Sequence, residues 1–372
     1  MDRGAVTGEA RASLLAQEKI RVLVVDDSVV FRSLVSRMVE QDPLLELVGT
    51  ARNGIDAVAK IPRLSPDLVT LDVEMPELDG LGALRQIASL YPHIRVIMFS
   101  SLTARGAQVT VEALMAGASD YITKPSGGPV SSDLFLNLAG ELSSKIRGLF
   151  PIRAAGQRKK PGIVPVALTP RFSAVPPRFR LAPRVFVIGV STGGPSALAE
   201  IVPQIPADFP LPIAIVQHMP PHFTKLLAER LARVSMIPVV EAAEGMIAAP
   251  ATALIAPGDY HMRLVQEGAH LKVSLNQQAP ENSCRPAVDV LFRSVADACH
   301  GAVVAAVLTG MGQDGLLGVR QLKDLGATVF VQDRASSVVW GMPGAVAEAG
   351  LADEILPLQQ IVPTVLNKVV CR

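Results

Sequence analysis

The sequence predicts an α/β protein made of two doubly wound parallel-sheet domains. Short, wholly apolar segments alternate with segments of helical periodicity, which is typical of parallel strands covered by helices on both faces. The alternation stops once, over residues 151–184, where the chain has seven prolines, eight Arg or Lys and no Asp or Glu. The length of 372 residues is enough for two or three domains. We therefore expect two domains joined by a linker.

The first half predicts a flexible tail over residues 1–19 and then a domain over residues 20–148. Its apolar runs predict strands at 20–25, 45–49, 67–71, 94–99 and 119–122. Segments of helical periodicity lie near 29–40, 54–61, 79–90, 105–116 and 132–147. Strand and helix thus alternate throughout this domain.

After a linker over residues 149–183, we expect a second α/β domain over residues 184–372. Its apolar runs predict strands at 185–190, 211–217, 302–308 and 328–332. Between 253 and 274 apolar and polar residues alternate, which predicts an antiparallel hairpin.

Charge and composition exclude several classes of protein. The net charge is only +1 and aromatic residues make up 4%, so neither a basic DNA-coating surface nor base stacking is expected, and we predict no nucleic-acid partner. No apolar run approaches the roughly 20 residues of a membrane span, so we predict no membrane insertion. Three cysteines make no disulfide framework, and the first residues have no signal-peptide pattern. These observations favour a cytoplasmic protein.

Polar side chains follow the strands of the first domain. Asp26 and Asp27 follow the first strand and Asp72 follows the third. Ser100 ends the fourth strand, and Lys124 follows the fifth. One such Asp is most simply a helix N-cap, but the carboxyl ends of parallel strands meet at one edge. Three carboxylates meeting there repel each other unless a cation lies among them, and Mg²⁺ with a phosphoryl group suits such a site.

This combination closely resembles the receiver domain of two-component response regulators, a flavodoxin-like fold, over about residues 20–148. The resemblance implies that Asp72 accepts a phosphoryl group from a histidine kinase. It implies Mg²⁺ ligands at Asp26, Asp27, Asp72 and the carbonyl of Glu74. It also implies the switch residues Ser100 and Tyr121 and the phosphate-contacting Lys124.

The second domain opens with the pattern Gly-x-Ser-x-Gly, centred on Ser191. This spacing is typical of a nucleophile on a sharp strand-to-helix turn. A glycine-rich phosphate loop is the alternative, and it would indicate a receiver-linked, nucleotide-binding oxidoreductase. That alternative fits less well, because a dinucleotide fingerprint has Gly at the position of Ser191. The next strand also ends in Gln217 and His218, without the acid that binds ribose.

A hydroxyl nucleophile needs a base and a group that orients the base. His218 ends an apolar strand at the same predicted edge, and Asp314 lies in a glycine-flanked turn after another strand. Either residue alone is most simply structural, but with the serine they predict a Ser–His–Asp triad. A zinc site of His218, His222 and Cys284 is the metal alternative; the prolines between the two histidines break the helical spacing it needs.

Six segments carry a second resemblance: GVSTGGP, QHMPPHF, APGDYHM, CRPAVDVLF, LTGMGQDG and SSVVWGMP. Together they resemble the chemotaxis protein-glutamate methylesterase/glutaminase, a receiver-regulated serine hydrolase with a Rossmann-like catalytic domain. With the receiver and the linker, the resemblance spans nearly the whole chain. It implies a nucleophile at Ser191, a general base at His218, an orienting acid at Asp314 and oxyanion donors at the backbone amides of Thr192 and Met311.

The same resemblance implies an activity and its control. The substrates would be glutamyl methyl esters, with release of methanol, and glutamines, with release of ammonia, on chemoreceptors. The esterase chemistry itself would need no cofactor. We expect the receiver to pack over the catalytic cleft at rest and to shift when Asp72 is phosphorylated.

Overall fold

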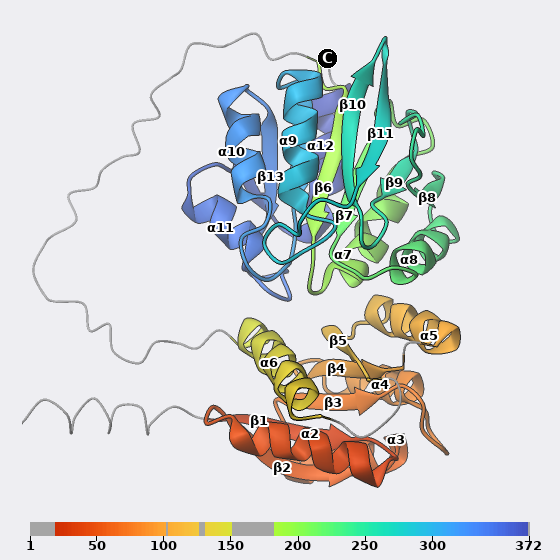
Figure 1. The fold of residues 1–372 in the computed structure, drawn as a ribbon, viewed down its shortest axis with the longest axis vertical. Helices are drawn as coiled ribbons and strands as arrows, with labels where there is room; N and C mark the ends of the chain where they lie inside the picture. Colours follow the sequence, from red (N-terminus) through yellow and green to blue (C-terminus); the bar gives the residue numbers. More distant parts are fainter. Residues whose placement is uncertain (1–18, 102, 126–130, 151–181, 371–372) are drawn as a thin grey trace, which may run out of the picture.

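The computed structural model describes residues 19–101, 103–125, 131–150 and 182–370 (Figure 1). The tail predicted at residues 1–19 and the linker predicted at 149–183 lie almost entirely outside these residues and stay predictions. In the part of the chain that is described, no helix is long and apolar enough to cross a membrane.

The first domain is a five-stranded parallel sheet in the order β2-β1-β3-β4-β5. Its strands are β1 (Ile20–Val25), β2 (Leu45–Ala51), β3 (Leu68–Asp72), β4 (Arg95–Ser100) and β5 (Asp120–Thr123). Its helices are α2 (Val29–Gln41), α3 (Gly54–Leu64), α4 (Gly80–Leu90), α5 (Ala104–Met115) and α6 (Ser132–Leu149).

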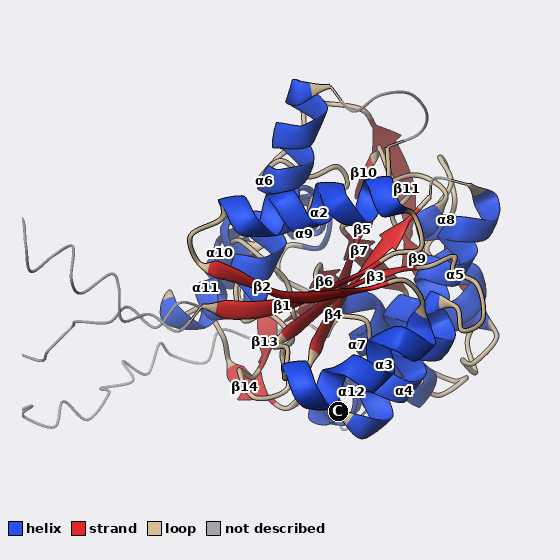
Figure 2. Ribbon diagram, turned by 90° about the horizontal axis from the view of Figure 1, so that it is seen from below, coloured by secondary structure: helices blue, strands red, loops and turns tan. Residues whose placement is uncertain are grey.

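Alternate residues of each strand face different helices, as the wholly apolar strands predict. Val22 and Val24 of β1 pack with α2 and α6, while Leu23 and Val25 pack with α3, α4 and α5. Figure 2 shows α2 and α6 on one side of this sheet and α3 and α4 on the other. The first domain therefore has the predicted doubly wound architecture.

The second domain is a seven-stranded parallel sheet in the order β14-β13-β12-β6-β7-β9-β8, with a separate antiparallel hairpin. Its strands are β6 (Val185–Val190), β7 (Ile213–Gln217), β8 (Val239–Glu241), β9 (Ala253–Ile255), β12 (Val303–Val307), β13 (Thr328–Gln332) and β14 (Glu354–Leu356). The hairpin is β10 (His261–Glu267) with β11 (His270–Asn276). The helices are α7 (Gly194–Ile201), α8 (Phe223–Ala232), α9 (Val288–Cys299), α10 (Leu316–Asp324), α11 (Met342–Glu348) and α12 (Leu358–Val370), with a short 3₁₀ turn at Val202–Gln204. Helices α9, α10 and α11 cover one face, and α7, α8 and α12 the other. The predicted fold class is thus confirmed.

The hairpin prediction was wrong at its start. Residues 253–255 form β9, which pairs in parallel with β7 and β8 inside the main sheet. All three residues of β9 are buried, so the strand is covered on both faces. Strands β8, β9 and β14 have three residues each, which is too short for periodicity to separate a central strand from a hairpin strand.

The order of the strands locates a binding edge in the second domain. From β6 the chain builds β7, β8 and β9 on one side, and then crosses over to build β12, β13 and β14 on the other. The strand order therefore reverses between β6 and β12, and ligands of open α/β sheets bind outside the carboxyl ends of strands at such a point.

The two domains share an apolar interface. Helices α5 and α6 and strand β5 face α7 and α8 in Figure 1, and α5 contacts both α7 and α8. One hydrophobic cluster runs from α5 into α7 and α8. The Tyr121 ring of β5 also stacks on Phe223 of α8, with 5.0 Å between ring centroids. The carboxyl ends of β6 and β7 lie next to this interface, on the side of the second domain that faces the first.

Candidate active site

The first group of candidate residues meets at the carboxyl edge of the first sheet. Asp26, Asp27 and Asp72 offer carboxylate oxygens that all lie within 4.8 Å of one another. Lys124 Nζ lies 2.7 Å from Asp26 Oδ2 and 2.8 Å from Asp72 Oδ1. Burial raises the pKa of Asp72 to about 6, although Lys124 opposes the shift. An all-oxygen cluster in which burial disfavours negative charge fits a hard divalent cation such as Mg²⁺.

The predicted switch residues connect this edge to the second domain. Ser100 is fully buried, and its Oγ lies 2.6 Å from Thr110 Oγ1 and 3.1 Å from the Gly106 carbonyl oxygen, both in α5. Tyr121 lies against the second domain through its stacking on Phe223. Glu74 is exposed on the loop after β3, and its carbonyl as a metal ligand stays a prediction.

The second group of candidates lies on three neighbouring strands of the second sheet. Ser191 follows β6, His218 follows β7, and Asp314 lies in the loop after β12. His218 Nε2 lies 2.7 Å from Asp314 Oδ2. Ser191 and His218 line one cavity of about 500 Å³. The structure therefore brings the imidazole and the carboxylate into direct contact and places the hydroxyl in the same cavity.

Asp314 is held at the N-terminus of helix α9. Ala287 gives this helix no side-chain cap, and the amides of Val288 and Asp289 donate instead to the Asp314 carboxylate, at 2.6 and 3.0 Å. Its own neighbour Gly315 donates a further bond of 2.9 Å. Burial alone would raise the pKa of Asp314, but the bonds from His218 and these amides outweigh it and lower the pKa. The acid therefore stays ionised beside the imidazole.

The geometry assigns different tasks to the two ring nitrogens of His218. Nε2 faces Asp314, so the nitrogen left to accept a proton is Nδ1, which lies 3.5 Å from Cys284 Sγ. Among the described residues, no hydrogen bond joins His218 to Ser191 in this closed state. Burial lowers the pKa of His218, but the bonds to Asp314 and Cys284 outweigh it and raise the pKa to about 9.

The loop that carries Ser191 is built to bring backbone close to substrate. A Cβ on Gly189 would lie 2.3 Å from Val288, and Gly193 has a φ of 77°, so both positions need glycine. The Ser191 amide donates to the Thr309 carbonyl at 3.0 Å. In the described part of the chain, the amides of Thr192 and Met311 donate no hydrogen bond to the backbone. Two amides without a backbone acceptor thus flank the nucleophile.

The first domain closes over this cavity. It contributes part of the lining: Leu114, Asp120, Tyr121, Glu141, Ser144 and Lys145. The Thr192 hydroxyl donates a buried hydrogen bond of 2.7 Å to Asp120 Oδ2, and Lys145 Nζ lies 2.8 Å from Asp120 Oδ1. A Cβ on Gly148 of α6 would lie 2.8 Å from Met311 Sδ. The expectation that the first domain packs over the cleft is confirmed.

Two further histidines of the second domain, His222 and His261, have structural positions. His261 is buried and bonded to the Ala279 carbonyl and the Ala287 amide, while His222 precedes α8 at a φ of 70°. Within the described ranges, the carboxylates of Asp26, Asp27 and Asp72 are the only cluster of three possible metal ligands. The zinc alternative at His218 is therefore not supported.

Sequence reasoning missed Asn282 and Asp120 as neighbours of the site. Cys284 was named only as a ligand of the zinc alternative, and the structure places its Sγ 3.5 Å from His218 Nδ1. No sequence motif marks Asn282 or Asp120. The position of Asn282 depends on the conformation of a turn, and that of Asp120 depends on how the first domain docks on the second.

Comparison with known proteins gives consistent matches. The family model described as CheB methylesterase matches residues 186–365, and the response regulator receiver domain matches residues 22–130. A protein-glutamate methylesterase/protein-glutamine glutaminase of Trichodesmium erythraeum is 46% identical over 356 residues, which are 94% of this chain and 99% of that protein. One of Nocardioides sp. is 49% identical over 353 residues, covering 94% and 95%.

Among solved structures, the CheB methylesterase catalytic domain of Thermotoga maritima is similar at 41% identity. It covers 50% of this chain and 99% of its own, with a TM-score of 0.49. The oxidoreductase alternative is not supported by these matches.

Proposed function

The chain belongs to the protein-glutamate methylesterase/protein-glutamine glutaminase family, and we propose that it demethylates glutamyl methyl esters and deamidates glutamines on chemoreceptors. The observation that carries this proposal is the 2.7 Å contact between His218 Nε2 and Asp314 Oδ2, because His218 lines the same cavity as Ser191. Ser191 and Asp314 follow β6 and β12, between which the strand order reverses, and this supports the proposal further.

In the proposed mechanism, Ser191 Oγ attacks the side-chain carbonyl carbon of the substrate. His218 Nδ1 takes the hydroxyl proton and gives it to the departing methanol, while Asp314 holds the tautomer and stabilises the imidazolium. The amides of Thr192 and Met311 are the proposed donors to the oxyanion, and one such donor contributes roughly 3–4 kcal/mol in comparable enzymes.

The second half of the reaction uses the same groups. Water attacks the acyl-enzyme, His218 Nδ1 takes its proton, and Ser191 leaves with that proton as the glutamate is released. With ammonia as the first leaving group, the same steps convert glutamine to glutamate. One site therefore serves both activities, without a cofactor for the esterase chemistry.

The receiver domain supplies control by phosphorylation. We propose that Asp72 accepts a phosphoryl group from a histidine kinase and that Asp26, Asp27, Asp72 and the Glu74 carbonyl hold Mg²⁺. The ion would neutralise the phosphoryl oxygens. Lys124 would contact the phosphate, and Ser100 and Tyr121 would transmit the change to α5 and α8.

Closure of the cavity by Asp120, Tyr121 and Lys145 supports an inhibited resting state. Opening would expose Ser191 to a receptor. The free thiols Cys284 and Cys299 support a reducing compartment, and we propose the cytoplasm.

Methanol release from methylated receptor membranes tests the catalytic assignment. Ser191→Ala should abolish release in the presence of a small phosphodonor. The variant should still incorporate phosphate at Asp72, which controls for folding. Substantial release by a phosphorylated Ser191→Ala protein would refute the assignment.

A further inference from the structure

Residues 281–284 form a tight turn beside the acid–base pair. Glu281 and Cys284 exchange backbone hydrogen bonds of 3.1 and 2.8 Å, and Arg293 of α9 lies 2.6 Å from the Glu281 carboxylate. Asn282, at the tip, has a φ of 51°, a conformation that asparagine adopts more readily than most residues. The turn is therefore anchored to the helix whose N-terminus Asp314 caps.

The Asn282 side chain lies between two carboxyl groups. Its Nδ2 donates hydrogen bonds of 3.0 Å to Asp314 Oδ1 and 3.1 Å to Asp289 Oδ2. Asp289 is only 1% exposed, and its Oδ1 accepts a bond of 2.7 Å from the Gly318 amide. Burial, and secondarily the charge of Asp314, raise the pKa of Asp289. One amide thus separates two buried acids that would otherwise repel each other.

The same turn contacts both partners of the acid–base pair. Asn282 binds Asp314 Oδ1, which leaves Asp314 Oδ2 directed at His218 Nε2. Cys284, two residues on, lies 3.5 Å from the other nitrogen of the ring. An amide that fixes one carboxylate oxygen restricts rotation of the carboxylate, and such restriction keeps a catalytic imidazole in its productive orientation.

We propose that Asn282 is a positioning residue of the triad, which orients Asp314 toward His218 and holds it apart from Asp289. The proposal rests on the catalytic assignment above and adds a fourth side chain to it. Asn282 contacts no reacting atom in this scheme and acts only through Asp314.

Asn282→Gly is the cleanest removal of the amide, because glycine adopts the left-handed backbone without strain. In the full chain with phosphodonor, we expect kcat for methanol release to fall about tenfold with KM within about twofold. That loss is typical of one hydrogen bond to a charged group. Ser283→Gly is the matched variant, because position 283 also has a positive φ, of 61°, and gains the same backbone freedom.

Asn282→Asp supplies a readout that a merely structural role would not move. A third carboxylate next to Asp314 favours the imidazolium, so the rising limb of kcat/KM against pH should move to higher pH. NMR titration of the His218 ring in the full chain should show the same upward shift, with His218→Gln used to identify the signal.

Three results would overturn the proposal: equal kcat for Asn282→Gly and Ser283→Gly, a rise in KM with unchanged kcat, or an unshifted His218 titration in Asn282→Asp. Failure of the proposed function looks different. Wild-type protein would then release no methanol, while the His218 titration would still shift in Asn282→Asp because position 282 lies beside Asp314.

Discussion

The Thr192 hydroxyl donates a hydrogen bond of 2.7 Å to Asp120 Oδ2, which ties the loop next to Ser191 directly to strand β5 of the receiver domain. The bond is buried, and Lys145 compensates the Asp120 charge at 2.8 Å. The receiver therefore holds the proposed oxyanion loop as well as covering the cavity. Substitutions that break this hydrogen bond therefore test how the resting state is kept closed.

Breaking this bond should activate the unphosphorylated protein. A buried hydrogen bond to a charged group contributes about 1.5–3 kcal/mol, so Asp120→Ala should raise methanol release roughly tenfold or more without phosphodonor. Thr192→Val removes the donor from the other side, keeps the backbone amide, and should act in the same direction. Unchanged basal release in both variants would argue against the bond as a clamp.

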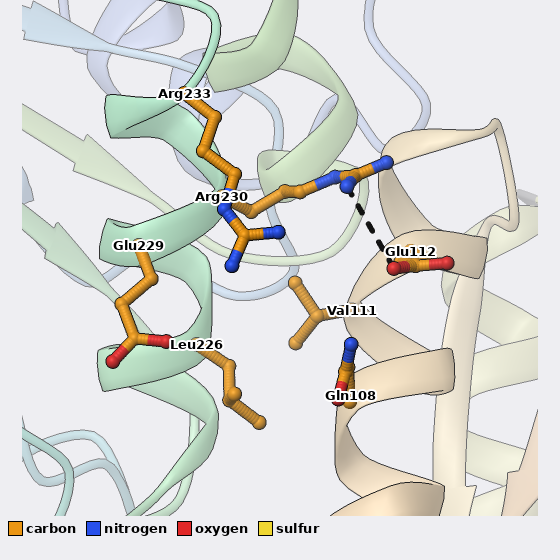
Figure 3. A pocket seen from close by; sticks show the side chains of 7 residues that line it. All are labelled: Gln108, Val111, Glu112, Leu226, Glu229, Arg230 and Arg233. Atoms are coloured by element: carbon orange, nitrogen blue, oxygen red, sulfur yellow. Dashed lines mark ion pairs between the residues drawn. The ribbon is translucent and has the colours of Figure 1, made fainter.

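An ion pair between the domains provides the contrast. Arg230 of α8 lies 3.7 Å from Glu112 of α5 at the rim of a small surface pocket (Figure 3). Both side chains are partly exposed, and such pairs contribute at most about 1 kcal/mol. Arg230→Ala should therefore change basal release by less than about fivefold. A larger effect than that of Asp120→Ala would reverse this ranking.

The raised pKa of His218 predicts how the resting enzyme responds to pH. The ring must be neutral to accept the Ser191 proton, and its pKa of about 9 exceeds the ordinary value of 6.5. For the unphosphorylated chain, kcat/KM should therefore rise with pH from 7 to 9. Cys284 contributes to the raised pKa of His218, so Cys284→Ala should move the rising limb of the kcat/KM profile to lower pH. Cys299→Ala removes a thiol far along α9 and should leave the limb in place.

Sequence patterns were sufficient for the longer strands and for the residues that follow their carboxyl ends. Ser191, His218 and Asp314 could be assigned to one edge because each follows a wholly apolar strand, and such strands end together in a parallel sheet. The same reasoning placed Asp26, Asp27 and Asp72 together. Periodicity carries this information because burial on both faces leaves a continuous apolar run.

Contacts that depend on how the two domains or a turn pack could not be predicted from sequence periodicity. The bond between Thr192 and Asp120 depends on how two domains pack, and the position of Asn282 depends on a turn held by backbone bonds. The choice of Nδ1 as the proton acceptor also follows from the approach of Asp314, which spacing along the chain does not determine. The prediction for β9 was wrong for a related reason, because a run of three apolar residues fits a parallel sheet and an antiparallel hairpin equally well.

Asp314 should stabilise helix α9 as well as orient His218. Asp314→Ala leaves the amides of Val288 and Asp289 without their acceptor, so their hydrogen exchange should accelerate roughly tenfold or more. Catalysis should fall by about 10⁴-fold, as in comparable triads. Because folding lowers the pKa of Asp314, this stabilisation is complete at neutral pH and is lost only as the pH falls through the folded value. Ser191→Ala should leave the exchange unchanged, and equal exchange in both variants would contradict the cap.

Ser100 should couple phosphorylation to opening. Its hydroxyl is bonded to Thr110 and Gly106 of α5, and α5 packs on α7 and α8 over the cavity. A phosphoryl group on Asp72 competes for this hydroxyl, so reorientation of Ser100 would release α5 from its resting position. Ser100→Ala should accept phosphate at Asp72 at a rate within a few-fold of wild type, yet lose most of the stimulation of methanol release.

Ser101→Ala is the matched control, because the one hydrogen bond that the Ser101 hydroxyl makes among the described residues is to Thr103, at 3.0 Å, and Thr103 precedes α5. Phosphate incorporation and methanol release are measured on the same samples. Asp72→Asn gives the background level of phosphate incorporation, and chelation of Mg²⁺ gives the level of methanol release without stimulation. Full stimulation of a phosphorylated Ser100→Ala protein would show that the signal reaches α8 by another route, with the stack of Tyr121 on Phe223 as the remaining direct connection to α8 from β5.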